Sequence, residues 1–316
     1  MRILITGGFG FLGGNLAKYI LKTTAGHEVI LGSRRLDKMC EWLPQVEVVN
    51  IQWANEMALE QICEGVDIVI HAAGMNAQDC ANDPESALEF NGYSTERLIG
   101  AAKAQRVKQF VYFSTAHVYA SPLIGTITEE TRPQNLHPYA TSHLAGEKSV
   151  LLAHGNGEIE GIVLRLSNAI GTPVSKDVNC WMLLINDLCK QVVETRKMVL
   201  RTSGLQQRDF ISVNEVCRAV AHLIFFKQNY FPDNCLCNIG SGVSKSIFEV
   251  AKLVKENCKV VLNIDPVIER PLTGIKEVHA PLDFRVDKLR QTKFEINPDL
   301  NPAIQELLDF CNFNFS

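Results

Sequence analysis

Short apolar runs alternate with helical stretches along the first half of the chain. Several of the runs are apolar at successive positions, as in the stretch DIVIHAAG at 67–74. Such runs are typical of a parallel sheet with helices on both faces. The predicted strands are Arg2–Thr6, Glu28–Leu31, Val46–Gln52, Ile68–Ala72, Gln109–Ser114 and Gly161–Leu166, and the predicted helices are Asn15–Lys22, Met57–Cys63, Glu85–Gln105 and Tyr139–Ala153.

This alternation predicts an α/β fold, a doubly wound parallel sheet of the Rossmann type. The second half is less regular and predicts a smaller α/β domain at the C-terminal end. Its expected elements are a helix around Cys180–Thr195, a strand at Met198–Thr202 and a small αβ segment near Ser246–Ile264. Proline and glycine cluster at 266–281, which predicts a surface loop there.

Composition narrows the class of protein. The 316 residues are 46% hydrophobic, which is enough for a large core. A net charge of −4 provides no polycationic surface, so we expect no nucleic-acid partner. We expect no membrane partner either, because no run of 18 apolar residues occurs.

The N-terminus and the cysteines bear on the compartment. MRILITGGFG runs straight into glycines and does not resemble a signal peptide. The ten cysteines are scattered without a CxxC pair, so we expect buried thiols and no metal site. The expected compartment is the cytoplasm.

A glycine-rich turn follows the first predicted strand. The stretch TGGFGFLG at 6–13 places Gly7, Gly10 and Gly13 at a spacing of three, just before a helix. Glycines there allow a tight turn, close approach of the backbone to a pyrophosphate, and close packing of helix on strand. The turn predicts a dinucleotide-binding domain over 1–166 together with about 208–238, and a substrate-binding domain over 167–207 and 239–316.

The end of the second predicted strand bears on the choice of dinucleotide. An NAD site usually has an acidic residue there for the ribose hydroxyls, about 20 residues past the glycines. This chain has Ser33, followed by Arg34 and Arg35. Guanidinium groups bind phosphate well, so NADP(H) is favoured over NAD(H), which stays possible. The alternative is that the arginines belong to a solvated loop.

Together these motifs resemble the extended short-chain dehydrogenases/reductases, the group of NAD(P)-dependent nucleotide-sugar epimerases, dehydratases and reductases. The resemblance covers essentially the whole chain. It rests on TGGFGFLG (6–13), DIVIHAAG (67–74), FNGYSTERLIGAA (90–102), FVYFSTAHVYA (110–120), PYATSHLAGEK (138–148), RLSNAIGTP (165–173), QQRDFISVNEVCRAV (206–220), NIGSG (238–242) and ERP (269–271).

The resemblance implies catalytic roles. Tyr139 matches the tyrosine that exchanges a proton with the substrate, and Thr115 matches the hydroxyl that binds the same substrate oxygen. Asn91 resembles the asparagine that organises a proton-relay water, the alternative being a helix cap. The dinucleotide would contact the glycine turn and the neighbouring positions of the second and fourth predicted strands. These are Gly7, Gly10, Phe11, Leu12, Gly13, Ser33, Arg34, Arg35, Ala72 and Ala73, and His143 on the predicted helix from Tyr139 would contact the dinucleotide as well.

Three further positions match the substrate site of the family. Asn168 resembles a residue that contacts the substrate diphosphate, and Arg208 and Arg270 resemble the arginines that grip it. For Arg208 the alternative is a salt bridge with Asp209 or another acid.

His143 departs from the family pattern, which has Tyr-x-x-x-Lys where this chain has Tyr-x-x-x-His. The family's lysine supplies positive charge to the tyrosine and holds the nicotinamide ribose. His143 lies on the same helix face as Tyr139, and a neighbouring carboxylate could raise its charge. Lys148 is half a turn away from Tyr139 and cannot replace the lysine. We expect an active enzyme with a slower proton step or a shifted pH optimum.

The reaction is narrowed by the residues after Thr115. Dehydratases of the group usually have an Asp-Glu pair there, whereas this chain has Ala116 and His117, so 4,6-dehydration is disfavoured. The favoured reaction is NADPH-dependent reduction of a 4-keto nucleotide sugar, with Tyr139 as proton donor. The alternatives are an NAD(P)-dependent 4-epimerase and a non-catalytic dinucleotide sensor. The family resemblance also implies a homodimer, formed by the stretch Glu85–Lys103 and the helix from Tyr139.

Overall fold

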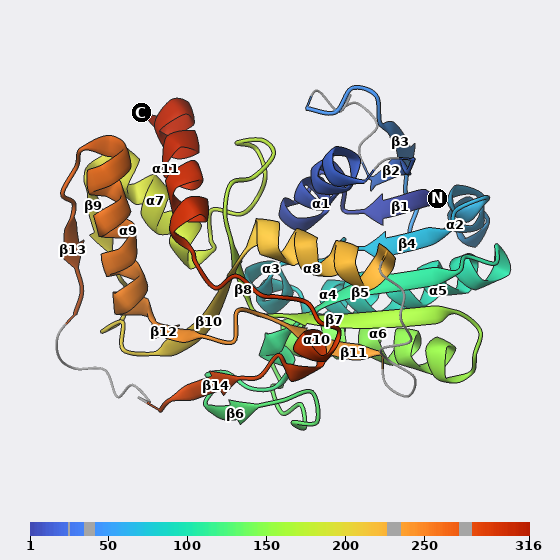
Figure 1. Ribbon diagram of the computed structural model, residues 1–316. Helices are drawn as coiled ribbons and strands as arrows, with labels where there is room; N and C mark the ends of the chain where they lie inside the picture. The colour runs from blue at the N-terminus through green and yellow to red at the C-terminus, as the bar shows by residue number, and fades with distance from the viewer. Residues whose placement is uncertain (25, 35–41, 226–234, 272–279) are drawn as a thin grey trace.

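The computed structural model describes residues 1–24, 26–34, 42–225, 235–271 and 280–316. Its main element is a parallel seven-stranded sheet in the order β11-β7-β5-β4-β1-β2-β3 (Figure 1). The strands are β1 (Arg2–Thr6), β2 (Glu28–Ser33), β3 (Glu47–Asn50), β4 (Ile68–His71), β5 (Gln109–Thr115), β7 (Glu160–Leu166) and β11 (Leu236–Ile239). The strand order reverses between β1 and β4. The predicted Rossmann-type sheet is therefore confirmed.

Helices cover both faces of this sheet. Helices α1 (Phe11–Thr23) and α8 (Val213–Phe225) pack together on one face, while α2 (Glu56–Cys63), α5 (Ser94–Ala104) and α6 (Pro138–Gly155) cover the other. Alternate residues of β1 enter different cores: Ile3 and Ile5 face α1, and Leu4 faces α2 and α5. Burial on both faces explains why the strands are apolar at successive positions.

The helical stretch predicted over 85–105 is not one regular helix. It begins with α4 (Pro84–Ala87), continues as the π-helix η1 (Leu88–Tyr93) and ends as α5. A further helix that was not predicted, α3 (Ala77–Asn82), precedes it. The wider winding of η1 contains Asn91, and π-helical turns often lie at functional sites.

The second half forms a separate group of elements around a third apolar core. Helices α7 (Leu184–Thr195), α9 (Ile247–Leu262) and α11 (Asn301–Phe315) pack together away from the large sheet (Figure 1). A three-stranded sheet of β12 (Ser244–Ser246), β10 (Gln207–Ser212) and β8 (Asn168–Ile170) connects this group to the large sheet. The smaller α/β region is as expected, and the exact domain limits stay a prediction.

The expected loop at 266–281 is partly wrong. Strand β13 (Val267–Glu269) pairs in parallel with β9 (Lys197–Val199). The pairing gives the backbone N–H and C=O groups of both short strands hydrogen-bond partners. Residues 272–279 lie outside the described part of the chain. The remaining elements are η2 (Ala116–Val118), β6 (Gly125–Ile127), which pairs with β14 (Leu282–Phe284), and α10 (Asp287–Gln291).

The described cysteines are all buried, and Cys40 lies outside the described residues. Burial raises the pKa of these thiols, for example that of Cys63 to about 12. Within the described ranges, no helix is long and apolar enough to cross a membrane.

Candidate active site

The glycine turn lies at the point where the strand order reverses. Gly7 has a φ of +66°, and its carbonyl accepts a 2.8 Å hydrogen bond from the backbone N–H of Gly10. A Cβ on Gly7 would lie 2.8 Å from the backbone of Ala72 and Ala73, which follow β4. A Cβ on Gly13 would overlap the carbonyl oxygen of Gly7. No side chain therefore fits at Gly7 or Gly13 without moving the backbone around it.

The crevice fits a dinucleotide pyrophosphate. Phe11 and Leu12 open helix α1, so their backbone N–H groups and that of Gly13 belong to its first turn and have no carbonyl partner within the helix. No acidic residue occurs in that turn. The N-terminus of α1 therefore provides free donors and a favourable potential for an anion next to the bare backbone of Gly7.

The loop after β4 is fixed by a buried polar chain. The Thr6 hydroxyl lies 2.7 Å from Nδ1 of His71 and accepts from the backbone N–H of Ala73 at 3.3 Å. Nε2 of His71 lies 3.0 Å from the hydroxyl of Thr95, which donates to the carbonyl of Asn91. These contacts connect β1, β4 and the π-helix directly beneath the crevice.

The end of β2 is open to solvent at Arg34. Ser33 is the last strand residue and is half-buried, whereas Arg34 is exposed. The Arg34 guanidinium lies 5.1 Å from the centroid of the Phe90 ring, in cation–π contact. Arg35 lies outside the described residues. The described end of β2 therefore presents a hydroxyl and a cation where an NAD site usually has a carboxylate.

Thr115 and Tyr139 are brought together although they are far apart in sequence. Thr115 ends β5 and Tyr139 lies in the first turn of α6, which packs against β5. The Thr115 hydroxyl is close enough to the Tyr139 phenol to lower its pKa in part. Burial is the larger effect and raises that pKa above its usual value. The phenol is therefore protonated at neutral pH and can act as a proton donor.

Asn91 is buried, and its side-chain amide bonds to two other segments. Its Oδ1 accepts from the backbone N–H of Met75 at 2.8 Å, and its Nδ2 donates to the Ser142 hydroxyl at 3.0 Å. Because it lies within η1 and joins two other segments, the alternative role of a helix cap is wrong. Asn91 therefore connects the loop after β4 to α6. Its contact on α6, Ser142, directly precedes His143.

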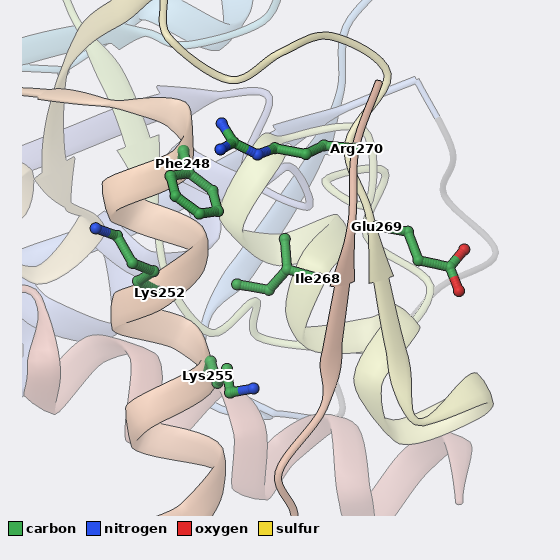
Figure 2. Close-up of a pocket in the computed structure, with 6 residues that line it drawn as sticks. All are labelled: Phe248, Lys252, Lys255, Ile268, Glu269 and Arg270. Carbon is green, nitrogen blue, oxygen red and sulfur yellow. The ribbon is translucent and has the colours of Figure 1, made fainter. Parts of the chain in front are cut away.

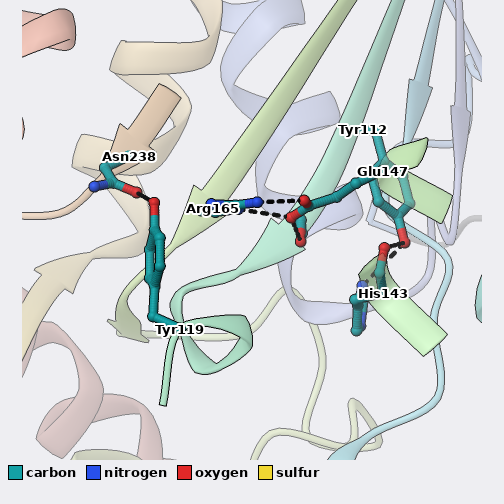
Figure 3. Close-up of polar contacts among 7 residues, drawn as sticks. Tyr112, Tyr119, His143, Glu147, Arg165 and Asn238 are labelled. Carbon is teal, nitrogen blue, oxygen red and sulfur yellow. Dashed lines mark hydrogen bonds and ion pairs between the residues drawn. The ribbon is translucent and has the colours of Figure 1, made fainter. Parts of the chain in front are cut away.

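His143 lies beside Tyr139 as the sequence spacing predicts. The two ring centroids are 4.6 Å apart in an edge-on arrangement. The hydroxyl of Tyr112, on β5, lies 3.0 Å from Nδ1 of His143 (Figure 3). Burial lowers the pKa of His143 to about 4, so the imidazole is neutral at pH 7.

The suggestion that a carboxylate raises the charge of His143 is not supported. Glu147, one turn along α6, accepts hydrogen bonds from Nε and Nη2 of Arg165 at 2.9 and 2.6 Å and from the Ser114 hydroxyl. Figure 3 shows this carboxylate directed at Arg165, away from the imidazole. His143 therefore takes the place of the family's lysine without its charge.

The expected diphosphate residues lie around the loop before β10. Nη2 of Arg208 lies 3.4 Å from the side-chain oxygen of Gln206, and Nη1 of Arg270 donates to the carbonyl of Ser203 at 2.6 Å. Asn168 donates to the carbonyl of Asp209 at 2.8 Å, which joins β8 to β10.

Arg208 does not pair with its sequence neighbour. The Asp209 carboxylate instead accepts from the hydroxyls of Ser167 and Ser241, at 2.6 and 2.9 Å. Among the described residues, no carboxylate forms an ion pair with Arg208, and burial lowers the pKa of its guanidinium. The salt-bridge alternative with Asp209 is therefore wrong, and Arg208 keeps its charge available for an anion.

Arg270 also lines a surface hollow of about 650 Å³ (Figure 2). Its guanidinium lies over the Phe248 ring, 3.6 Å from the centroid. Lys252 lies 5.0 Å from the same ring, and Lys255 lines the hollow below it. The hollow is thus bordered by three cations and the Phe248 ring, together with Ile268 and Glu269.

Two residues of the site escaped the sequence analysis. His117 lies 6.4 Å from Tyr139 between ring centroids, and burial together with the positive charge of Arg208 lowers its pKa to about 4. Its position directly after Thr115-Ala116 was a usable signal. Tyr112 had no such signal, because a tyrosine within a buried strand is read as a core residue.

The comparisons with known proteins agree with this geometry. A model of the "NAD dependent epimerase/dehydratase family" matches residues 3–240. The chain belongs to this family. The family resemblance drawn from the motifs is confirmed, and the chain is an extended short-chain dehydrogenase/reductase.

The relatives of this chain are named for two different activities. The human dTDP-D-glucose 4,6-dehydratase is 27% identical over 298 residues, covering 87% of this chain and 81% of the relative. A putative UDP-glucose 4-epimerase of Methanocaldococcus jannaschii is 24% identical, covering 99% of each chain. The structure of a UDP-glucuronic acid 4-epimerase from Bacillus cereus, in complex with UDP-glucuronic acid and NAD, superposes over the full length of both chains. Its TM-score is 0.81 and its identity is 21%.

Proposed function

We propose that this family member reduces a 4-keto nucleotide sugar, with Tyr139 as the proton donor. The observation that carries the proposal is the Thr115–Tyr139 hydroxyl pair beside a neutral histidine. A phenol whose pKa is raised gives up a proton only to an oxygen that becomes strongly basic, as a carbonyl does during reduction. Without a neighbouring cation, Tyr139 is a poor base for the opposite direction.

The chain contributes the positioning and the proton. The Thr115 and Tyr139 hydroxyls would both donate to the substrate carbonyl oxygen, which polarises the carbonyl and stabilises the alkoxide. Tyr139 then transfers its proton to that oxygen. When bound, a reduced dinucleotide would provide the hydride that the carbonyl carbon needs. Asn91, fixed by Met75 and Ser142, would hold the water that returns a proton to Tyr139.

We propose NADP(H) as the preferred dinucleotide. The glycine crevice and the N-terminus of α1 would hold its pyrophosphate, and Ala72 and Ala73 would border the nicotinamide half. Ser33 in place of a carboxylate removes repulsion toward a 2′-phosphate, and Arg34 provides a donor for it. Because the structure of the Bacillus cereus epimerase contains NAD, NAD(H) is the competing cofactor.

We further propose that the substrate is a sugar linked to a nucleoside diphosphate. Arg208 forms no ion pair with a described carboxylate, and its positive charge reaches His117, whose ring lies beside that of Tyr139. Arg270 donates to the carbonyl of Ser203 and Asn168 to the carbonyl of Asp209, and both would share the diphosphate. This arrangement argues against the dinucleotide sensor, which would not use a second anion site.

A 4-epimerase is the second candidate, favoured by the Methanocaldococcus jannaschii and Bacillus cereus epimerases described above. It would keep one NAD bound and use Tyr139 alternately as base and acid. Ala116 continues to disfavour 4,6-dehydration, because alanine cannot protonate a leaving hydroxyl.

The deciding experiment measures cofactor exchange and turnover in the purified protein. We expect fluorescence titration to show tighter binding of NADPH than NADH, and Arg34→Ala to weaken NADPH far more than NADH. Reduction of 4-keto nucleotide sugars should consume NADPH and stop in Tyr139→Phe, while that variant still binds the dinucleotide. A retained NAD(H) with interconversion of 4-epimers would replace the reductase by the epimerase. Undiminished turnover in Tyr139→Phe would refute the mechanism.

The homodimer stays a proposal. Leu88 and Tyr93 on η1 and Leu152 on α6 are exposed apolar side chains on the two stretches that the family resemblance indicates. Sedimentation velocity is expected to give twice the monomer mass, and Leu152→Lys should shift it toward the monomer.

A further inference from the structure

The substitution of the family's lysine by His143 creates a requirement that a lysine does not have. A neutral imidazole carries one proton, on either Nδ1 or Nε2, and only the protonated nitrogen donates a hydrogen bond. A lysine ammonium has three donors and needs no such choice. If His143 is to donate toward a bound dinucleotide, some neighbour must determine which nitrogen carries the proton.

The neighbour in contact with Nδ1 is Tyr112. Its hydroxyl lies 3.0 Å from Nδ1, compared with 3.4 Å from the carbonyl of Asn91 and 3.5 Å from the carbonyl of His143 (Figure 3). The Asn91 carbonyl already accepts from the Thr95 hydroxyl at 2.7 Å. The best acceptor for the Tyr112 proton is therefore Nδ1, which leaves the imidazole proton on Nε2.

The Nε2 edge faces the crevice. A Cβ built on Gly74 would lie 3.7 Å from Cε1 and 3.9 Å from Nε2 of His143. Gly74 directly follows Ala73, whose backbone borders Gly7. His143 is 7% exposed, and none of the described residues hydrogen-bonds Nε2.

We propose that Tyr112 is a positioning residue that holds His143 in the Nε2–H form, directed at a ribose hydroxyl of the bound dinucleotide. The inference rests on the proposed role of His143 at the dinucleotide. It adds the residue that makes a histidine usable in place of lysine. Tyr112 acts through the imidazole and itself contacts neither substrate nor dinucleotide.

Other charged or titratable groups near His143 do not compete for this role. Tyr139, on the same helix, presents its ring edge-on, and His71 of β4 is neutral because burial lowers its pKa to about 3. Glu147 of α6 is held by Arg165, and Cys80 of α3 contacts Asn91. Among the described residues, only Tyr112 contacts Nδ1.

The first test reads the tautomer directly in the dinucleotide-free protein. Long-range ¹H–¹⁵N correlation of histidine-labelled protein at neutral pH should show the Nε2–H pattern for the imidazole of His143. That signal should be absent in His143→Gln and should become mixed in Tyr112→Phe. A His143 signal of the Nδ1–H form in the unsubstituted protein would overturn the inference, whether or not the proposed reaction is correct.

The second test is a double-mutant cycle on dinucleotide affinity. Tyr112→Phe should weaken binding about five- to tenfold when residue 143 is His, as loss of one hydrogen bond does. In the His143→Lys background the same change should have almost no effect, because an ammonium needs no tautomer. An equal loss in both backgrounds would mean that Tyr112 is only structural and would overturn the proposal.

The matched control is Tyr119→Phe. Tyr119 is also a buried tyrosine, and it donates its hydroxyl to Oδ1 of Asn238 at 2.7 Å (Figure 3). Its substitution should leave dinucleotide affinity unchanged in both backgrounds. If the unsubstituted protein binds neither NADPH nor NADH, the proposed function fails, and the tautomer measurement still decides the contact between Tyr112 and His143.

Discussion

Removal of the Glu147 charge should strongly destabilise the protein. Glu147 and Arg165 form a bidentate pair whose side chains are only 2% and 6% exposed. The pair joins α6, which carries Tyr139 and His143, to β7, the strand next to the edge strand β11. Glu147→Gln keeps the volume but leaves the Arg165 guanidinium buried without its counter-charge.

The size of the effect follows from this burial. Breaking a buried pair by removing one partner costs about 3–5 kcal/mol, because the remaining charge stays desolvated. Part of the Arg165 charge is still compensated by the Tyr119 ring, 4.7 Å away, so we expect the lower end, about 3 kcal/mol. That is a large share of the total stability of a typical domain.

The assay is urea unfolding followed by circular dichroism at pH 7. A matched control is Glu158→Gln, which removes the partner of Lys103 in an ion pair that is 34% and 39% exposed and should cost less than about 1 kcal/mol. The double variant Glu147→Gln/Arg165→Met should recover part of the loss. A cost below about 1 kcal/mol for Glu147→Gln would refute the argument that burial makes this pair essential.

Three further outcomes are expected. Gly13→Ala should weaken dinucleotide binding more than about tenfold by titration, because its Cβ would overlap the carbonyl oxygen of Gly7. Gly100→Ala, with open space around it on α5, should instead stabilise the fold by about 0.5–1 kcal/mol. Equal effects of the two variants on dinucleotide affinity would contradict the steric argument. Burial favours the neutral forms of His71 and His143, so between pH 6.5 and 4 the unfolded chain binds more protons than the folded chain. The free energy of unfolding, measured in urea, should therefore fall by about 2 kcal/mol per histidine from pH 7 to 5. A free energy of unfolding that does not change with pH would contradict this reasoning. His143→Lys should preserve or raise turnover near pH 7 by steady-state assay; a large loss would show a specific role for the histidine.

The sequence was most informative where one local pattern serves one purpose. The strands of the large sheet were predictable because both faces are buried, so every position must be apolar. The glycine turn was predictable because a φ of +66° at Gly7 and the overlap at Gly13 exclude other residues. The π-helix at Leu88–Tyr93 was not predictable, since an α-helix of the same residues would also bury one apolar side. Within it, Asn91 bonds to Met75 and Ser142, which only the folded chain brings next to it.

The sequence by itself determined the family, the dinucleotide crevice and the positions of Tyr139 and His143 on one helix face. The tertiary structure decided the state of these groups. Burial beside Tyr112 makes His143 neutral, and the pairing of Glu147 with Arg165 removes the carboxylate that spacing alone left available. A pKa depends on desolvation and on charges from distant segments, which only the folded chain brings together.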